Sequence, residues 1–259
     1  MHRFALFLGM GTALVAANAC GRGAVGPVAA AATRDDTDEV RRLIREGHPA
    51  DERDPRFGIT ALMDAARVGA VNAMAVLLDA GANPNARDDN TRWTPLLHAI
   101  HKQQPDAVRL LLDRGADPNL ASPANVTPLL MAADDPNPAI VSSLLEHGAN
   151  PRVEGPGGMT PLTQAVSGGA LTDVTDRPLL GGCHPATVRA LLAHDPGLTL
   201  PSTFAGRQAL WWARFHDCEE VLRLIGATGA GVAHQVVAGA GLVRDAVTPA
   251  KPKKPTAKD

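Results

Sequence analysis

The sequence predicts an all-α solenoid of stacked helix–turn–helix units. Three signals recur at a period of 33 or 34 residues, and the first is the series Thr60-Ala61-Leu62, Thr94-Pro95-Leu96, Thr127-Pro128-Leu129 and Thr160-Pro161-Leu162. The others are a leucine pair and a Gly-Ala step: Leu77-Leu78 and Gly81-Ala82, Leu111-Leu112 and Gly115-Ala116, Leu144-Leu145 and Gly148-Ala149. A fixed period of this length is typical of repeat architectures. Only 3% of the residues are aromatic, so Ala, Leu and Val supply the apolar volume, which suits closely packed helices.

Each part of the unit has a physical role. Thr caps the first helix with its hydroxyl, and Pro fits the first helical position because no needed donor is lost there. Small residues such as Ala65-Ala66 let neighbouring helices approach. The leucine pair lies on the face of the second helix that packs between units. The following Gly ends that helix in the left-handed conformation, and the next loop opens at Asn83-Pro84-Asn85, Asp117-Pro118-Asn119 and Asn150-Pro151.

Weaker copies extend the array in both directions, to about six units. Gly26-Pro27-Val28 begins a capping unit, and Ala209-Leu210-Trp211 begins a last unit. We expect residues 231–247 to cover the open face of this last unit. The unit that begins at Thr160 has its leucine pair 31 residues later instead of 17, so it carries an insertion near 169–183. Such an insertion is a surface loop that either serves binding or is neutral. The predicted units are 26–59, 60–93, 94–126, 127–159, 160–208 and 209–247.

These motifs resemble the ankyrin repeat, both in the T-P-L start and in the G-A-[DN]-x-N turn. The resemblance implies an ankyrin-repeat solenoid with β-turn fingers between its helix pairs. It also implies a non-catalytic module that binds another protein through its concave face. One position departs from the family, because the His that follows T-P-L there and links neighbouring units is replaced by Met63, Leu97, Leu130, Thr163 and Trp211. We therefore expect the stack to depend on apolar packing more than on that polar link.

The resemblance further implies which residues face a partner. In the family, the residue before T-P-L and the residues two and three positions earlier point toward the groove. Carried over position by position, the partner-binding residues are Phe57, Ile59, Thr91, Trp93, Val126, Met159, Phe204 and Arg207. The four apolar residues directly before T-P-L would form an exposed stripe, which marks an interaction surface, unless some of them fold inward against neighbouring fingers.

No catalytic motif is recognisable, so we expect no enzyme activity, no cofactor and no metal site. The sequence lacks a G-x-S-x-G elbow and a P-loop. His98 and His101 share a helix face, but no Cys or acidic residue at metal-ligand spacing supports them. Two other interpretations stay open: an envelope enzyme with a site on the 170–183 insertion around Cys183 and His184, and a lipid-tethered structural protein.

Cys183 and Cys218 are the candidates for a disulfide in an oxidising compartment. Alignment places both at the turn between the two helices of successive units. Equivalent positions in stacked repeats lie about 10 Å apart, whereas a disulfide allows only about 4.4–6.8 Å between Cα atoms. The insertion that ends at Cys183 could close this gap, and two unpaired thiols are the alternative.

The N-terminus has the pattern of an export signal. Residues 1–19 read as a signal peptide, with Ala17-Asn18-Ala19 as the cleavage site before Cys20. The same junction resembles a bacterial lipobox, so Cys20 is a candidate for lipidation and the one predicted route to a membrane. We expect a monomer in the periplasm or cell envelope.

The C-terminus and the charge balance bear on the partner. Residues 248–259 hold four Lys and three Pro, which predicts a disordered tail. The chain's net charge is −2, and removing the tail's +3 and the +1 of Arg3 leaves −6 for residues 20–247. Nucleic acid needs a clustered basic face, so the predicted partner is a protein.

Overall fold

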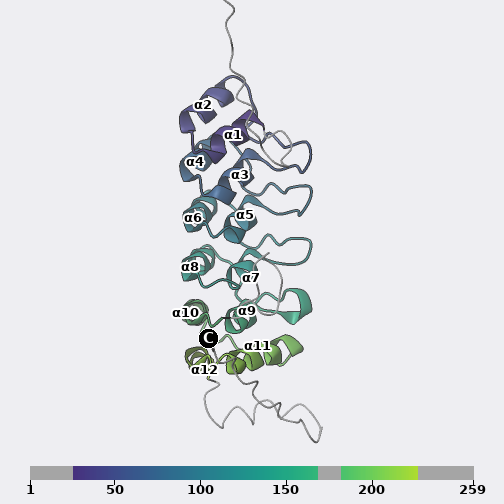
Figure 1. Ribbon diagram of the computed structural model, residues 1–259, viewed down its shortest axis with the longest axis vertical. Helices are drawn as coiled ribbons and strands as arrows, with labels where there is room; N and C mark the ends of the chain where they lie inside the picture. The colour runs from purple at the N-terminus through teal and green to yellow at the C-terminus, as the bar shows by residue number, and fades with distance from the viewer. Residues whose placement is uncertain (1–25, 169–181, 227–259) are drawn as a thin grey trace, which may run out of the picture.

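The fold is an elongated double layer of helices. The structure, a computed structural model, describes residues 26–168 and 182–226. Odd-numbered helices form one layer, even-numbered helices form the other, and the connecting loops project from the odd-numbered layer (Figure 1). These ranges contain twelve α-helices and one short 3-10 helix: α1 (Pro27–Thr33), α2 (Thr37–Arg45), α3 (Ala61–Val68), α4 (Val71–Asp79), α5 (Pro95–His101), α6 (Pro105–Asp113), α7 (Pro128–Ala132), α8 (Pro138–Glu146), η1 (Pro156–Gly158), α9 (Pro161–Ser167), α10 (Pro185–His194), α11 (Phe204–Phe215) and α12 (Glu219–Leu224). The predicted all-α solenoid is confirmed.

Threonine caps fix where four odd-numbered helices begin. Each hydroxyl accepts a hydrogen bond of 3.2–3.3 Å from the backbone N–H three residues later: Thr60, Thr94, Thr127 and Thr160. These are the predicted caps. Three glycines end even-numbered helices with φ between 84° and 89°, where a side chain would be strained: Gly81, Gly115 and Gly148.

The core follows the leucines of the repeat. Leu77, Leu111 and Leu144 are fully buried, and each lies on an even-numbered helix. Burial of one such side chain stabilises the fold by about 1.5–3 kcal/mol. The buried residues form one cluster that runs from Val28 in α1 to Val221 in α12, because each unit shares its apolar face with its neighbours.

Polar links between units run along the turns that follow even-numbered helices. The Asn85 side chain accepts a hydrogen bond from the Asp117 N–H at 2.8 Å and donates one to the Gly115 carbonyl at 3.1 Å. Asn119 makes the same two bonds to the following turn, at 2.9 and 3.0 Å. This amide ladder adds directional contacts to the apolar packing, at a place different from the family's His position.

The last helix pair starts earlier than the sequence predicted. α11 begins at Phe204, five residues before Ala209, because the Thr203 hydroxyl caps it by accepting the Gly206 N–H at 3.4 Å. A Cβ on Gly206 would lie 1.9 Å from a backbone carbonyl oxygen, so only Gly fits this start. The extended helix reaches toward the side on which the loops of other units project (Figure 1). Trp211 consequently lies in the middle of α11 and not at its start.

Some predicted segments lie outside the described residues. These are the signal peptide with Cys20, residues 169–181 of the insertion predicted near 169–183, the proposed end cover over 231–247 and the tail over 248–259. α9 ends at Ser167 and α10 begins at Pro185, so the two helices of this unit flank the predicted insertion.

Candidate functional site

A groove of about 470 Å³ lies where two finger loops meet the odd-numbered layer. Its walls come from the loops that precede α3 and α5 and from these two helices. The lining residues are Phe57, Ile59, Arg67, Asp88, Asn90, Thr91, Trp93, His98, His101 and Lys102. Four of the eight predicted partner-binding residues are among them: Phe57, Ile59, Thr91 and Trp93.

Loop length differs between the fingers by one residue. One backbone hydrogen bond closes each finger, and in the first two fingers it joins residues five apart: Asp54 N–H to Ile59 at 2.8 Å and Asp88 N–H to Trp93 at 3.0 Å. In the next two it joins residues four apart: Ser122 N–H to Val126 at 3.0 Å and Gly155 N–H to Met159 at 2.7 Å. The longer loops belong to the units with the 34-residue period.

This difference corrects the predicted apolar stripe. Ile59 and Trp93, at the ends of the longer loops, are half-buried and line the groove. Val126 and Met159, at the ends of the shorter loops, are 6% and 7% exposed and belong to the core cluster. The tighter loop holds the last residue against the helices, so the exposure predicted for Val126 and Met159 is wrong.

Asp88 fixes the shape of the second finger. Its buried carboxylate accepts the backbone N–H groups of residues 90–93, the Thr91 hydroxyl at 2.6 Å and His98 Nε2 at 3.1 Å. Burial by itself would raise the pKa of Asp88, but hydrogen bonds from His98 and Thr91 outweigh burial and lower this pKa below its usual range. The sequence analysis missed Asp88, although an Asp that begins a polar turn is typical of this bonding.

Trp93 forms the aromatic part of the groove. Its ring forms T-shaped pairs with the rings of His98 and His101, with ring centres 5.5 and 5.2 Å apart. Because His98 also holds Asp88, the aromatic cluster and the finger loop support each other. The indole is therefore held in place before any partner arrives.

Two cations line the same groove. Lys102, the C-cap of α5, is exposed and forms no ion pair with any residue that the structure describes. Arg67 on α3 contacts Asp64 at 3.4 Å through one guanidinium nitrogen. The sequence analysis named neither residue, because helix residues that face a finger loop are identified only once the stacking register is known.

Phe204 and Arg207 lie on α11, so the finger positions predicted for them are wrong. The early start of α11 converts this finger into helix. Phe204 is 69% exposed, and Trp211 and Phe215 are also exposed. Spacings of seven and four residues place the three rings on one helix face. Trp211 and Phe215 stack with ring centres 5.1 Å apart, in an aromatic surface that is separate from the groove.

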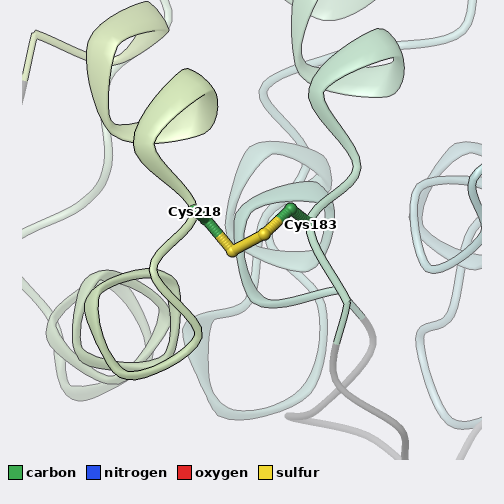
Figure 2. The surroundings of a disulfide bond; sticks show 2 residues. All are labelled: Cys183 and Cys218. Carbon is green, nitrogen blue, oxygen red and sulfur yellow. A yellow bond between two sulfur atoms is a disulfide. The ribbon is translucent and has the colours of Figure 1, made fainter.

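A disulfide joins Cys183 to Cys218, with Cα atoms 5.6 Å apart (Figure 2). Cys183 precedes α10 and Cys218 is the N-cap of α12. The bond therefore ties the start of one even-numbered helix to the start of the next. The structure shows the paired state and not the alternative of two unpaired thiols.

His184 is the N-cap residue of α10, next to this disulfide. Burial lowers the pKa of His184, and a hydrogen bond to the Ala133 backbone opposes part of that effect. In the disulfide form the Cys183 sulfur is already bonded, so it cannot act as a thiolate nucleophile beside His184. This weakens the interpretation that placed an enzyme site on these two residues.

Residues 26–168 and 182–226 contain neither a metal-binding cluster nor a membrane-spanning helix. No group of three or more His, Cys, Asp or Glu side chains in these ranges is placed to hold a metal ion. None of the helices in the same ranges has the length and apolar character needed to cross a bilayer.

Comparison with known proteins finds a similarity to ankyrin repeats. Residues 28–122 match the family model for ankyrin repeats in three copies. A protein of Treponema pallidum (strain Nichols), named as ankyrin repeat-containing, is 40% identical over 65 residues. The match covers 25% of this chain and 22% of that protein, so the chain spans less than a quarter of that relative's length. Ankyrin repeats generally mediate protein–protein interaction and are typically non-catalytic. Residues 28–122 are therefore similar to ankyrin repeats, and the helix-pair unit continues beyond them to α12.

Proposed function

We propose that the protein is a non-catalytic binding module of the bacterial cell envelope, and that it holds a protein partner in the groove between its first two fingers. One observation carries the proposal. Two finger loops and two helices bring Phe57, Ile59, Thr91 and Trp93 to a single groove of about 470 Å³. Trp is enriched among the residues that dominate binding energy at protein interfaces.

The groove is suited to binding because it is already organised. Asp88 fixes the loop that carries Thr91 and Trp93, and two histidine rings hold the indole. A preorganised surface loses less conformational freedom on binding, which increases affinity. Val126 and Met159 lie in the core, so the proposed contact surface is confined to the first two fingers.

Two features support a location outside the cytoplasm. The apolar run over residues 4–17 precedes a small-residue cleavage motif. The Cys183–Cys218 disulfide is a bond that persists in oxidising compartments. Cys20 would then be the new N-terminal residue and the point of lipid attachment. Cell fractionation tests the location, because recovery of the mature protein in the cytoplasm alone would contradict it.

Affinity capture from native envelope extracts, followed by mass spectrometry, tests the binding site. Trp93→Ala should reduce recovery of the specific partner by about 30-fold or more, the effect of losing a hot spot of ~2 kcal/mol. Trp211→Ala is the matched control, because it removes an exposed indole from α11, away from the groove. Equal recovery by Trp93→Ala and the unmodified protein, with both folded by circular dichroism, would rule out this groove.

A further inference from the structure

We propose that the groove selects a partner segment in which a large apolar side chain is flanked by carboxylates. The inference rests on the proposed function, because it names the chemistry of the partner at the same groove. It follows from three features of the described lining residues: the apolar surface, the hydrogen bonds that already occupy the Asp88 carboxylate, and the two cations, Arg67 and Lys102.

The apolar surface fits one large side chain. Trp93 and Ile59 are half-buried and Phe57 is exposed on the first finger. Trp93 forms T-shaped pairs with His98 and His101 on α5 and is still partly exposed, so a partner side chain can contact the indole. A volume of about 470 Å³ is within the ~300–1,000 Å³ range of ligand pockets.

Asp88 is the one carboxylate among the described residues that line the groove, and its oxygens already have hydrogen-bond donors. Asp88 accepts four backbone N–H groups, the Thr91 hydroxyl and the His98 ring. Its oxygens are therefore already hydrogen-bonded inside the finger and offer no free acceptor to a basic side chain. A lysine in the partner would have no lining carboxylate to pair with.

The cations remain available. Lys102 is exposed, and Arg67 uses one guanidinium nitrogen at 3.4 Å for Asp64, which leaves other donors for a second carboxylate. Hydrogen bonds between such cations and carboxylates are stronger than those between neutral groups. Arg67 lies in the last turn of α3 and Lys102 is the C-cap of α5, the two helices that line the groove, so carboxylates next to an inserted apolar residue can be bound at these two helix ends.

The net charge of residues 20–247 makes the preference for carboxylates specific to this groove. Residues 20–247 carry a formal net charge of −6, so acidic peptides are repelled from most of the surface. A local positive site in an acidic body favours acidic segments only at that site.

Short synthetic peptides test the proposal by fluorescence anisotropy. The probe has a central Phe flanked by Glu residues in a Gly-Ser background. One comparator replaces the Glu residues by Lys, and another replaces the Phe by Ala. We expect the acidic Phe peptide to bind at least about tenfold more tightly than either comparator, since like charges and the lost aromatic each weaken binding.

Charge reversal on the protein assigns the effect to the groove. Lys102→Glu should weaken binding of the acidic Phe peptide about three- to tenfold, as expected for an edge charge, and should narrow the difference from the Lys peptide. Arg109→Glu, at an exposed position on α6 in the other layer, is the matched control and should change binding less than about twofold.

Each contrary outcome identifies what fails. Equal binding of Glu and Lys peptides, no measurable binding of either, or equal effects of Lys102→Glu and Arg109→Glu would overturn the acidic preference. If capture of the native partner still depends on Trp93 in those cases, the proposed function stands and only the inferred chemistry is wrong.

Discussion

Asp88 shows how one buried carboxylate shapes the groove. Its carboxylate gathers the donors of the second finger, and His98 reaches it from α5. If Asp88 accepted hydrogen bonds only from the backbone N–H groups and the hydroxyl of its own loop, it would order that loop without attaching it to a helix. The His98 contact also fixes the loop to the helix layer, and the groove depends on both.

Asp88→Asn should destabilise the protein by roughly 2 kcal/mol at pH 7, because bonds to a charged acceptor are lost and a donor faces other donors. The pKa of Asp88 is lowered in the folded state, so its stabilisation is full above the unfolded pKa of about 4 and is lost as pH falls. Urea unfolding at pH 7 and near pH 3 should therefore show the variant and the parent converging in acid.

Asp89→Asn is the matched control for this prediction. Asp89 is the next residue along the same loop, and its side chain is 62% exposed. Its ion pair with Arg53 at 3.4 Å is a surface contact, which contributes little to stability. Comparable losses for Asp88→Asn and Asp89→Asn would show that the loop does not depend on the buried carboxylate.

His184, a base where Asp88 is an acid, should give the stability of the protein a second dependence on pH. Burial lowers the pKa of His184 in the folded state, so the unfolded chain binds a proton more readily. The free energy of unfolding should therefore fall as pH drops below about 6.5, by at most ~1.4 kcal/mol per pH unit.

Thermal unfolding between pH 8 and pH 5.5 tests this dependence. His184→Gln should flatten the pH profile, whereas His194→Gln, an exposed histidine at the end of the same helix, should leave the profile unchanged. A profile that His184→Gln does not alter would assign the dependence to another group.

At the scale of elements, the disulfide is the covalent tie of the C-terminal helices. It joins residues 35 apart in sequence, and closing a loop of that length in the unfolded chain stabilises a protein by roughly 4 kcal/mol before any strain. α12 is a helix of six residues with one buried residue, so it has little packing of its own to replace this bond.

Cys183→Ser and Cys218→Ser should each lower stability by about 2–4 kcal/mol. Hydrogen exchange should accelerate in α10 and α12 while α3 to α6 stay protected, because the bond lies at one end of the stack. Reductant should reproduce the effect in the parent protein and have none in the variants. Unchanged exchange in α12 would mean that packing alone secures this end.

At the scale of the whole molecule, the period in the sequence predicted the stack because each unit repeats the same local chemistry. Threonine caps, Ala pairs, core leucines and terminal glycines all act within about one unit, so their spacing alone specifies the helix pairs. The start of α11 escaped prediction, since it depends on the Thr203 cap and on close packing at Gly206.

The site was predictable only in part, for a related reason. Position along the unit selected Phe57, Ile59, Thr91 and Trp93, and the structure brings these four residues together in one groove. It failed at Val126 and Met159, where the finger closes one residue sooner and the side chain enters the core. The difference between a 34- and a 33-residue period was visible in the sequence, but its effect on exposure required the loop geometry.

The amide ladder of Asn85 and Asn119 has a mechanical consequence. Each rung joins one turn only to the next, so a pull on the two ends would load the rungs in series and break them singly. The cross-link from Cys183 to Cys218 resists such a load at one extremity. A stretched molecule should thus unfold from the side of α1 and stop at α10 to α12, which the disulfide holds together.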